Sequence, residues 1–377
     1  MAFDLSTIRP LNAQEQRMMD ETAGMLTMEL PESVYDIDTD WMRRAIHAGG
    51  HDVTVTRAER IDVIHSTCTK ARFELTYDRD IGLPTRMILK GAFEDHSERM
   101  QDMYRWEARF YRQIAPHVPL NLPATFWAGI DKHGWRAATL MEDLVARNVT
   151  FCRAQQPFGY DHIRNRLDQL AGMHAQTWNS PELLPGGRWS WVAGRFDASA
   201  MPYTDYYLEK ERWNHFMEAP RGVVVARELQ DREWMRHALR RIGEIEREDA
   251  FCLIHGDTHP GNLFVEDGGN PGFFDPTVSR SSWWLEVSYH LVSAIDIAHR
   301  RAWEAPLLTY YLTALERAGG PRIDFDHAWL RYRQGLVYGL FIFLINETTF
   351  QTEATNAAYT ARFGIAAIDH DTVRMLG

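Results

Sequence analysis

The sequence predicts an α+β fold with two lobes, a small antiparallel β-sheet lobe with one inserted helix and a larger, mainly helical lobe. Three observations lead to this prediction. Short runs rich in β-branched and aromatic residues fill the first part of the chain, one helical pattern interrupts them, and helical patterns dominate after residue 143. We expect residues 1–30 to form an N-terminal extension, 31–143 the sheet lobe and 144–377 the helical lobe.

The strands of the first lobe are predicted from runs of β-branched and aromatic residues that partly alternate with polar ones. Polar turns separate the first three runs, and two more apolar runs follow the prolines at positions 116, 119 and 123. The expected strands lie within residues 53–60, 71–77, 86–90, 123–130 and 135–144.

The inserted helix is predicted over residues 97–114, between the third and fourth strands. Its apolar residues recur at spacings of three and four, which places them on one helical face. Glu107 is an acidic exception on that otherwise apolar face. In the second lobe, helical patterns cover residues 163–178, 231–246, 284–299, 306–317 and 328–346.

The composition narrows the classes of partner. With 45% hydrophobic residues, a chain of 377 residues can bury a substantial core. The formal net charge of -11 argues against nucleic acid, because phosphate backbones are bound by clustered Lys and Arg. The most apolar run, residues 335–345, is too short to span a bilayer, and the N-terminus has no apolar stretch of signal-peptide length. We therefore expect neither a nucleic-acid nor a membrane partner.

The three cysteines, Cys68, Cys152 and Cys252, are scattered along the chain without CxxC spacing. This spacing argues against a disulfide framework and against a thiolate zinc site. We expect three free thiols and a cytoplasmic location, where thiols stay reduced.

The densest polar cluster is the segment HGDTHPGN, residues 255–262, which stands between two apolar runs. A short loop between two hydrophobic strands presents side chains on a rigid support. Asp275 ends another apolar run, thirteen residues after Asn262.

Phosphoryl transfer from ATP requires a carboxylate that orients the acceptor hydroxyl and oxygen ligands that hold Mg²⁺ against the phosphates. In kinase catalytic loops the Asp base stands five residues before a metal-binding Asn, and a second metal-binding Asp follows on a later strand. Asp257, Asn262 and Asp275 have this order and spacing. They predict a kinase in which Asp257 is the catalytic base and Asn262 and Asp275 bind Mg²⁺.

The motifs HGDTHPGNLF and FFDP resemble the signature of the aminoglycoside phosphotransferase and choline kinase superfamily. Within it, the chain is most similar to the ecdysteroid-kinase-like branch, also called CHK kinase-like, through segments such as LMEDL, QLAGMHAQTW and NETTFQTEATNAAYTARFG. The similarity runs from about Pro31 to the end of the chain. It implies a protein-kinase-like fold and an ATP- and Mg²⁺-dependent phosphotransferase with an alcohol group as acceptor, acting on a small hydroxylated molecule.

The resemblance also implies roles for residues of the first lobe. Lys90 would contact the α- and β-phosphates of ATP, with Glu107 as its partner on the helix. Residues 141–144 would form the hinge between the lobes. There the backbone groups of Glu142 and Leu144 would bind the adenine edge.

Two departures from the family pattern concern the support of the phosphates and of the catalytic loop. Ser66, Thr67 and Thr69 would lie over the phosphates, but their segment IHSTCTKAR contains no glycine. The family places a structural Asp after its metal-binding Asp, and Glu286 stands at the matching place here.

Two other functions remain open from the sequence. The missing glycines and Glu286 also fit a nucleotide-binding pseudokinase. His255, Asp257 and His259 form an HxDxH pattern, a spacing found in zinc or iron hydrolases, although the following Pro-Gly pair favours a turn. For a kinase we expect His255 to be structural. Trp283 or Trp284, soon after the second metal-binding Asp, is a candidate to line the acceptor site.

Overall fold

The computed structural model describes residues 24–132, 135–156, 158–197 and 200–376. These residues fall into two units. The first contains the described residues up to 117 together with 122–149, and the second contains residues 118–121 and those from 150 onwards. Most of the expected N-terminal extension, residues 1–23, lies outside the described residues.

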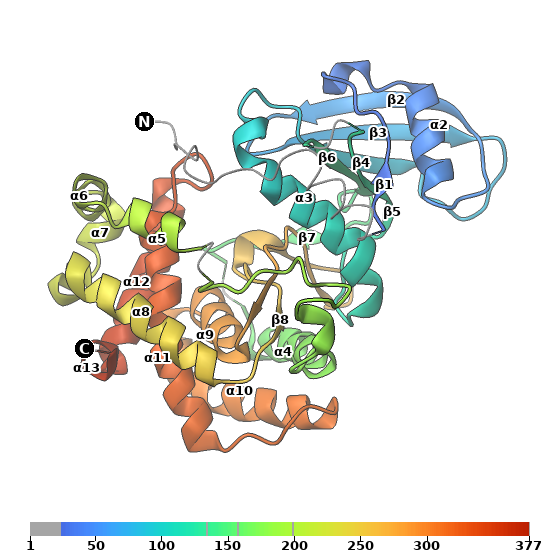
Figure 1. Cartoon of the computed structure of the whole chain (residues 1–377). Helices are drawn as coiled ribbons and strands as arrows, with labels where there is room; N and C mark the ends of the chain where they lie inside the picture. Colours follow the sequence, from blue (N-terminus) through green and yellow to red (C-terminus); the bar gives the residue numbers. More distant parts are fainter. Residues whose placement is uncertain (1–23, 133–134, 157, 198–199, 377) are drawn as a thin grey trace. The chain divides into compact units, whose positions relative to one another are not determined.

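A six-stranded sheet forms the centre of the first unit (Figure 1). Neighbouring strands are antiparallel except for the first, which is parallel to β5. All the strands expected from the sequence are present. In spatial order the strands are β1 (Leu26–Thr27), β5 (Thr125–Ile130), β6 (Ala137–Glu142), β4 (Arg86–Gly91), β3 (Thr69–Tyr77) and β2 (Val55–Ile64).

Two helical segments accompany this sheet. The expected helix over 97–114 is a continuous run of a 3₁₀ turn (Ser97–Met100), α3 (Gln101–Arg109) and a π-helical turn (Phe110–Ile114). The sequence analysis missed α2 (Thr39–Ala48), which is capped by Asp38 and buries Trp41 edge-on against Trp127, with 5.4 Å between ring centroids. Both tryptophans belong to the hydrophobic core of the unit.

The second unit is mainly helical and contains two small antiparallel sheets. One sheet joins β7 (Thr150–Phe151), β9 (Leu263–Val265) and β10 (Pro271–Phe273), and the other joins β8 (Cys252–Ile254) to β11 (Ser279–Ser281). The predicted α+β class, with a sheet-based part followed by a mainly helical part, is confirmed. The helices are α4 (Tyr160–Gln176), α5 (Met201–Tyr207), α6 (Lys210–Glu218), α7 (Pro220–Val223), α8 (Arg232–Glu248), α9 (Trp283–Ala294), α10 (Ile297–Arg317), α11 (Phe325–Ile345), α12 (Glu353–Asp369) and α13 (Thr372–Leu376).

The predicted helix boundaries around residue 300 were wrong. The pattern over 284–299 belongs to two helices, because Ile295 is extended and Asp296 caps α10 by accepting hydrogen bonds from the N–H groups of Ala298 and His299. Pro306 lies inside α10, although the sequence analysis placed a helix start there. A strong cap one residue before the helix therefore decides its start, and the proline is tolerated within it.

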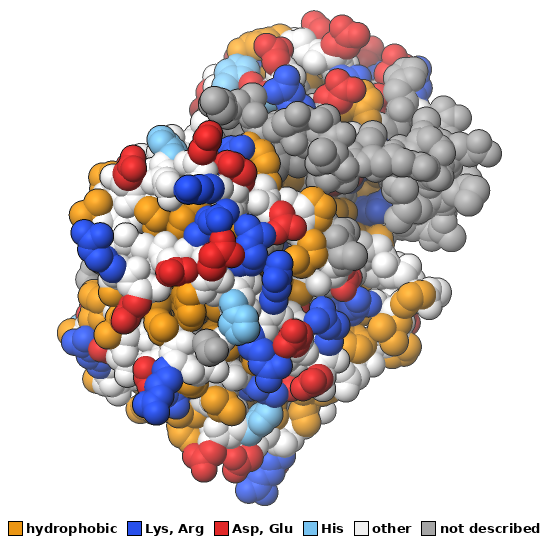
Figure 2. Space-filling view, turned by 60° about the vertical axis from the view of Figure 1, so that its left-hand side comes forward, with side chains coloured by type: hydrophobic (Ala, Val, Ile, Leu, Met, Phe, Trp, Pro, Cys, Tyr) orange, Lys and Arg blue, Asp and Glu red, His pale blue; other side chains and the backbone are white. Residues whose placement is uncertain are grey.

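No helix within the described ranges is long and apolar enough to cross a membrane. Cys68, Cys152 and Cys252 are buried and not joined in disulfides, as expected. Figure 2 shows a face on which basic side chains lie next to acidic ones. Arg236 forms an ion pair with Asp205 at 2.6 Å.

Candidate active site

The polar segment 255–262 connects β8 to β9 and ends in a 3₁₀ turn, Pro260–Asn262. The N–H of Phe274 donates to the carbonyl oxygen of Asn262 at 3.0 Å, and the N–H of Thr277 donates to that of His255 at 2.9 Å. The backbone on each side of Asp275 is therefore tied to both ends of this loop. The fold holds the predicted base and the predicted metal ligands on two hydrogen-bonded stretches of backbone.

Gly256 allows these two stretches to approach each other. Its φ is +83°, in the region that L-residues with a side chain rarely adopt. A Cβ at this position would overlap the carbonyl oxygen of Thr277 and the guanidinium of Arg195. That guanidinium donates to the carbonyl oxygens of Thr277 at 2.9 Å and of Gly256 at 3.3 Å. Glycine is thus required next to the candidate base.

The carboxylate of Asp257 is held by hydrogen bonds to both oxygens. The hydroxyl of Tyr289 donates to Oδ1 at 2.8 Å, and the Asn262 amide nitrogen donates to Oδ2 at 2.8 Å. The side chain keeps 26% exposure. Burial alone would raise the pKa of Asp257, but the neighbouring His259 ring and the hydrogen bond from Tyr289 outweigh it and lower the pKa. At neutral pH Asp257 is therefore ionised and oriented, as a proton acceptor requires.

Asn262 and Asp275 offer oxygen atoms of the kind that Mg²⁺ prefers. The amide nitrogen of Asn262 also donates to the Asp257 carbonyl oxygen at 3.0 Å. Since the nitrogen end of this amide is held by Asp257, the carbonyl end is the one suited to a cation. Asp275 adopts a φ of +53°, a conformation uncommon for residues other than glycine and often found at functional positions. Mg²⁺ usually takes one or two protein oxygens together with phosphates and waters, so this pair fits it.

The HxDxH alternative finds no support in the geometry. In the part of the chain that the structure describes, no group of three or more His, Cys, Asp and Glu side chains could hold a metal ion. His255 is fully buried, with its ring centroid 5.7 Å from that of Phe273. Burial lowers the pKa of His255. The position of His255 fits the structural role expected for it.

Glu286, in the first turn of α9, supports the backbone of the loop. Its carboxylate accepts hydrogen bonds from the N–H groups of His255 at 2.9 Å and Gly256 at 2.8 Å. A third bond of 3.1 Å joins it to Nε2 of His174 in α4, whose Nδ1 lies 2.7 Å from the hydroxyl of Tyr311. Burial would raise the pKa of Glu286, but the bonds to His174 and to the backbone lower it overall. Glu286 thus holds the backbone of the loop that carries Asp257.

Lys90 and Glu107 come together within the first unit. The Nζ atom of Lys90 on β4 lies 2.7 Å from Oε1 of Glu107 on α3. Both residues are buried, with 9% and 8% exposure. The acidic exception on the apolar helical face therefore has the partner that the sequence analysis expected for it.

Glu142 and Leu144 lie at the end of β6 and in the turn that follows it. The N–H of Glu142 donates to the carbonyl oxygen of Ala124, and its Oε1 accepts from Arg147 at 2.8 Å. Leu144 is buried, and its carbonyl oxygen accepts from Val149. The N–H of Glu142 is thus already used by the sheet.

The glycine-free segment between β2 and β3 is shaped by side-chain hydrogen bonds. The hydroxyl of Ser66, which is exposed, donates to the carbonyl oxygen of Cys68 at 2.9 Å. The carbonyl oxygen of Thr67 lies 3.0 Å from Nε2 of His96. Thr69 is fully buried and its hydroxyl donates to Glu94. Of the three residues, Ser66 and Thr67 are accessible to a ligand.

Sequence reasoning missed several residues that surround Asp257. Tyr289 follows Glu286 by three residues and so lies on the same face of α9, a spacing that could have revealed it. Arg195 lies in a segment without regular structure, where no pattern marks it.

Trp283 and Trp284, named as candidates to line the acceptor site, are buried in the first turn of α9. Trp283 stacks on Tyr311, and the indole N–H of Trp284 donates to Asp249 at 2.9 Å.

Residues 64–330 match the model of the phosphotransferase enzyme family, APH. Among solved structures, the choline kinase LicA from Streptococcus pneumoniae is similar, with 11% identity over 84% of this chain and 93% of that chain and a TM-score of 0.43. The microcompartment-associated aminopropanol kinase has 14% identity, covers 90% and 100% of the two chains and gives a TM-score of 0.44. A choline kinase from Cryptosporidium parvum Iowa II has 10% identity, 84% and 89% coverage and a TM-score of 0.47. The search of curated proteins gave no significant match.

Proposed function

This chain belongs to the phosphotransferase enzyme family, and we propose that it is a small-molecule kinase that transfers the γ-phosphate of ATP to a hydroxyl group of an organic acceptor. The observation that carries the proposal is the Asp257 carboxylate, which Tyr289 and Asn262 fix in place. Its ionised state suits a base that takes a proton from a hydroxyl.

In the proposed reaction, Asp257 accepts the proton of the acceptor hydroxyl as the new oxygen–phosphorus bond forms. The bond between the γ-phosphorus and the oxygen that bridges it to the β-phosphate breaks, and ADP leaves. The donors on Oδ1 and Oδ2 hold the carboxylate in one orientation before the substrate binds. Preorganisation of this kind lowers the barrier, because no reorganisation is needed during the reaction.

The remaining roles concern the nucleotide and Mg²⁺. Asn262 and Asp275 would hold the cation, which neutralises charge on the β- and γ-phosphates when bound. Lys90, oriented by Glu107, is proposed to contact the α- and β-phosphates. The other proposed nucleotide contacts come from Ser66, Thr67, Glu142 and Leu144. Thr69 is fully buried with its hydroxyl on Glu94, so it would support this segment and not contact the nucleotide itself.

Glu286 favours an active kinase over a pseudokinase. A weak loop support was one motive for the pseudokinase alternative, and Glu286 binds two backbone N–H groups of that loop. We assign the chain to the ecdysteroid-kinase-like branch from its motifs. Its acceptor would be a small hydroxylated molecule, and the free thiols support a cytoplasmic location.

The test measures ADP release with a panel of sterol-like, polyol and amino alcohols in magnesium buffer. We expect acceptor-dependent turnover in the wild type and a loss of about 100- to 10,000-fold in Asp257→Asn, the range attributed to general acid–base catalysis. Asp267→Asn, which changes an exposed carboxylate in the turn before β10, is the matched control and should retain full activity. Equal turnover in Asp257→Asn and the wild type would refute the proposed mechanism.

A further inference from the structure

The linker between α11 and α12, residues 346–352, touches the catalytic loop through Gln351. The amide of Gln351 lies 3.1 Å from Nε2 of His259, and Nε2 of His259 lies 3.5 Å from Oδ2 of Asp257. Nothing in the family motif explains this contact, because Gln351 follows the motif by almost ninety residues.

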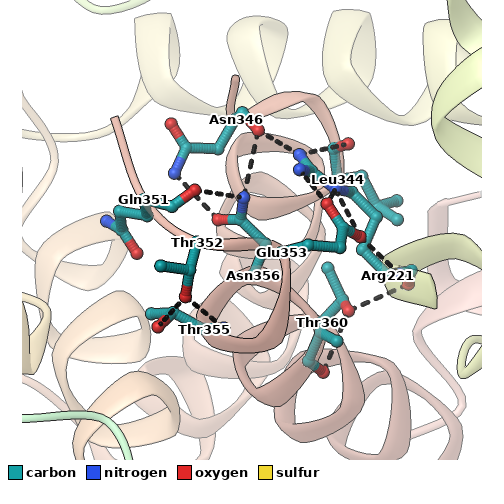
Figure 3. Close-up of polar contacts among 10 residues, drawn as sticks. Arg221, Leu344, Asn346, Gln351, Thr352, Glu353, Thr355, Asn356 and Thr360 are labelled. Atoms are coloured by element: carbon teal, nitrogen blue, oxygen red, sulfur yellow. Dashed lines mark hydrogen bonds and ion pairs between the residues drawn. The ribbon is translucent and has the colours of Figure 1, made fainter. Parts of the chain in front are cut away.

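The linker is anchored firmly at both ends. Arg221 of α7 has 1% exposure and faces Glu353, the first residue of α12, in a two-pronged ion pair (Figure 3). The same guanidinium donates to the carbonyl oxygens of Leu344 and Asn346, at the end of α11. A planar guanidinium with five donors can join three acceptors in this way, so Arg221 fixes the distance between the two helix ends.

Asn356 holds the middle of the linker from one turn inside α12. It is fully buried and its amide nitrogen donates to the carbonyl oxygens of Asn346 at 3.2 Å and Gln351 at 3.5 Å. The side-chain oxygen Oδ1 of Asn356 in turn accepts a hydrogen bond from the side-chain nitrogen of Asn346 at 2.9 Å. Figure 3 shows these groups beside the ion pair of Arg221. The backbone of Gln351 is thus held in place, which limits where its side chain can reach.

The hydrogen bonds of His259 determine which ring nitrogen carries the proton. Nδ1 accepts the N–H of Gly261 at 2.9 Å, and the hydroxyl of Tyr359 lies 3.4 Å from the same atom. A backbone N–H can only donate, so Nδ1 has no proton. His259 is therefore a neutral imidazole with its proton on Nε2, the atom next to Gln351 and Asp257.

The amide of Gln351 must then present its oxygen to His259. If the amide nitrogen of Gln351 stood 3.1 Å from Nε2 of His259, the NH₂ group and the ring N–H would be two donors facing one another. In that orientation Oε1 of Gln351 is buried without a hydrogen-bond partner among the described residues. A half-turn of the amide exchanges nitrogen and oxygen at almost no change in shape. This turn gives Oε1 a donor and gives Nε2–H an acceptor, so both groups are satisfied at once.

We propose that Gln351 is a positioning residue, whose amide oxygen accepts the Nε2–H of His259 and thereby fixes the ring beside the Asp257 carboxylate. The proton on Nε2 then lies between Gln351 and Oδ2 of Asp257. The hydrogen bonds to the carboxylate itself come from Tyr289 and Asn262, and a ring with its proton on Nε2 presents no second base beside Oδ2. This role rests on the proposed kinase function.

The first measurement is the tautomer of His259, read from the ¹⁵N chemical shifts of its ring in long-range ¹H–¹⁵N spectra of the full chain. We expect a protonated Nε2 and an unprotonated Nδ1 in the wild type at neutral pH, and the same tautomer in Gln351→Leu, because the N–H of Gly261 still donates to Nδ1. The second measurement is steady-state kinetics. Gln351→Leu should lower kcat by about threefold to tenfold, the effect of one neutral hydrogen bond, with an unchanged KM for ATP.

A conservative variant separates positioning from packing. Gln351→Glu keeps an acceptor for Nε2–H, so kcat should be close to the wild-type value well above neutral pH. Thr349→Ala, at an exposed position of the same linker, is the control and should change neither the tautomer nor the kinetics.

A proton on Nδ1 of His259 in the wild type would overturn the proposal. So would a Gln351→Leu variant with kcat within twofold of the wild type, or a Gln351→Glu variant as impaired as Gln351→Leu at every pH. If the wild type transfers phosphate to none of the acceptors, the kinase function itself fails. The tautomer measurement needs no turnover, so these two failures can be told apart.

Discussion

Replacement of Glu286 by Gln removes one charge from the centre of the second unit with almost no change in volume. The carboxylate accepts from two backbone N–H groups and from His174, and its side chain has no exposed surface. A Gln has one acceptor atom and one NH₂ group at the same positions, so at least one of these donors will face another donor. We therefore expect the catalytic loop to lose part of its support.

The expected cost follows from the contacts that are lost. A hydrogen bond to a charged group contributes about 1.5–3 kcal/mol, and a buried donor left without a partner costs about 1–3 kcal/mol. These two effects overlap, so we expect Glu286→Gln to lower the free energy of unfolding by about 2–4 kcal/mol. For a unit of this size that corresponds to a decrease in Tm of about 4 to 16 °C.

The effect should depend on pH in a defined direction. The pKa of Glu286 is lowered in the folded state, so its contribution to stability is complete above the ordinary Glu pKa of about 4.3 and is lost as the pH falls through the folded pKa. The difference in unfolding free energy between the wild type and Glu286→Gln should thus be constant from about pH 6 to 8 and shrink in acid.

The assay is thermal and urea unfolding followed by circular dichroism, with Glu316→Gln as the control. Glu316 is an exposed residue near the end of α10, and its replacement should leave Tm nearly unchanged. A decrease in Tm below about 2 °C for Glu286→Gln would refute the reasoning, because it would mean that the three donors need no charged acceptor. A difference that grows as the pH falls would contradict the sign of the pKa shift.

Two further predictions concern the nucleotide side and the loop backbone. Lys90→Met should lower kcat/KM for ATP by at least about tenfold, as expected for a lost charged contact to phosphate, and Glu107→Gln, which leaves the lysine in place, should have a smaller effect in the same titration of ATP. Equal binding of ATP by Lys90→Met and the wild type would contradict the proposed role of this lysine. Gly256→Ala combines a φ of +83° with overlap of the new Cβ and the Thr277 carbonyl oxygen, so it should destabilise the protein by more than about 2 kcal/mol. Gly268→Ala, with a φ of +92° but no atom within 4 Å of the new Cβ, is the matched control for strain alone and should cost about 1 kcal/mol in the same unfolding assay.

Local patterns in the sequence were sufficient to predict strands β2 to β6 and the helical run over 97–114 of the first unit, but not β1 or α2. Alternation of apolar and polar residues located its strands, and the three-and-four spacing located the helix over 97–114. These signals are local because each element buries one face. The small helix α2 was missed because its helical pattern is short, ten residues in all, and its burial depends on Trp127 in a distant strand.

The loop of Asp257 and Asn262 could be predicted for a different reason. The two residues lie five positions apart, and their contact at 2.8 Å is formed within the loop itself. The contacts of Tyr289 and Gln351 with this loop join residues that are 32 and 92 positions apart in the sequence. Such pairs depend on how helices pack. The three-residue spacing from Glu286 marks the face of α9 that carries Tyr289, whereas no periodicity marks Gln351.

The residues that were missed are also those that complete the polar environment of the loop. Asp257 and the turn around it receive hydrogen bonds or ring contacts from α9 through Tyr289, from the α11–α12 linker through Gln351 and from α12 through Tyr359. A buried polar network stabilises one arrangement only when all its members are satisfied. In the proposed kinase the motif supplies the reacting groups, whereas α9 holds Asp257 through Tyr289, and the linker and α12 hold His259 beside it. A change in any of them should alter the rate of phosphoryl transfer while the motif itself stays intact.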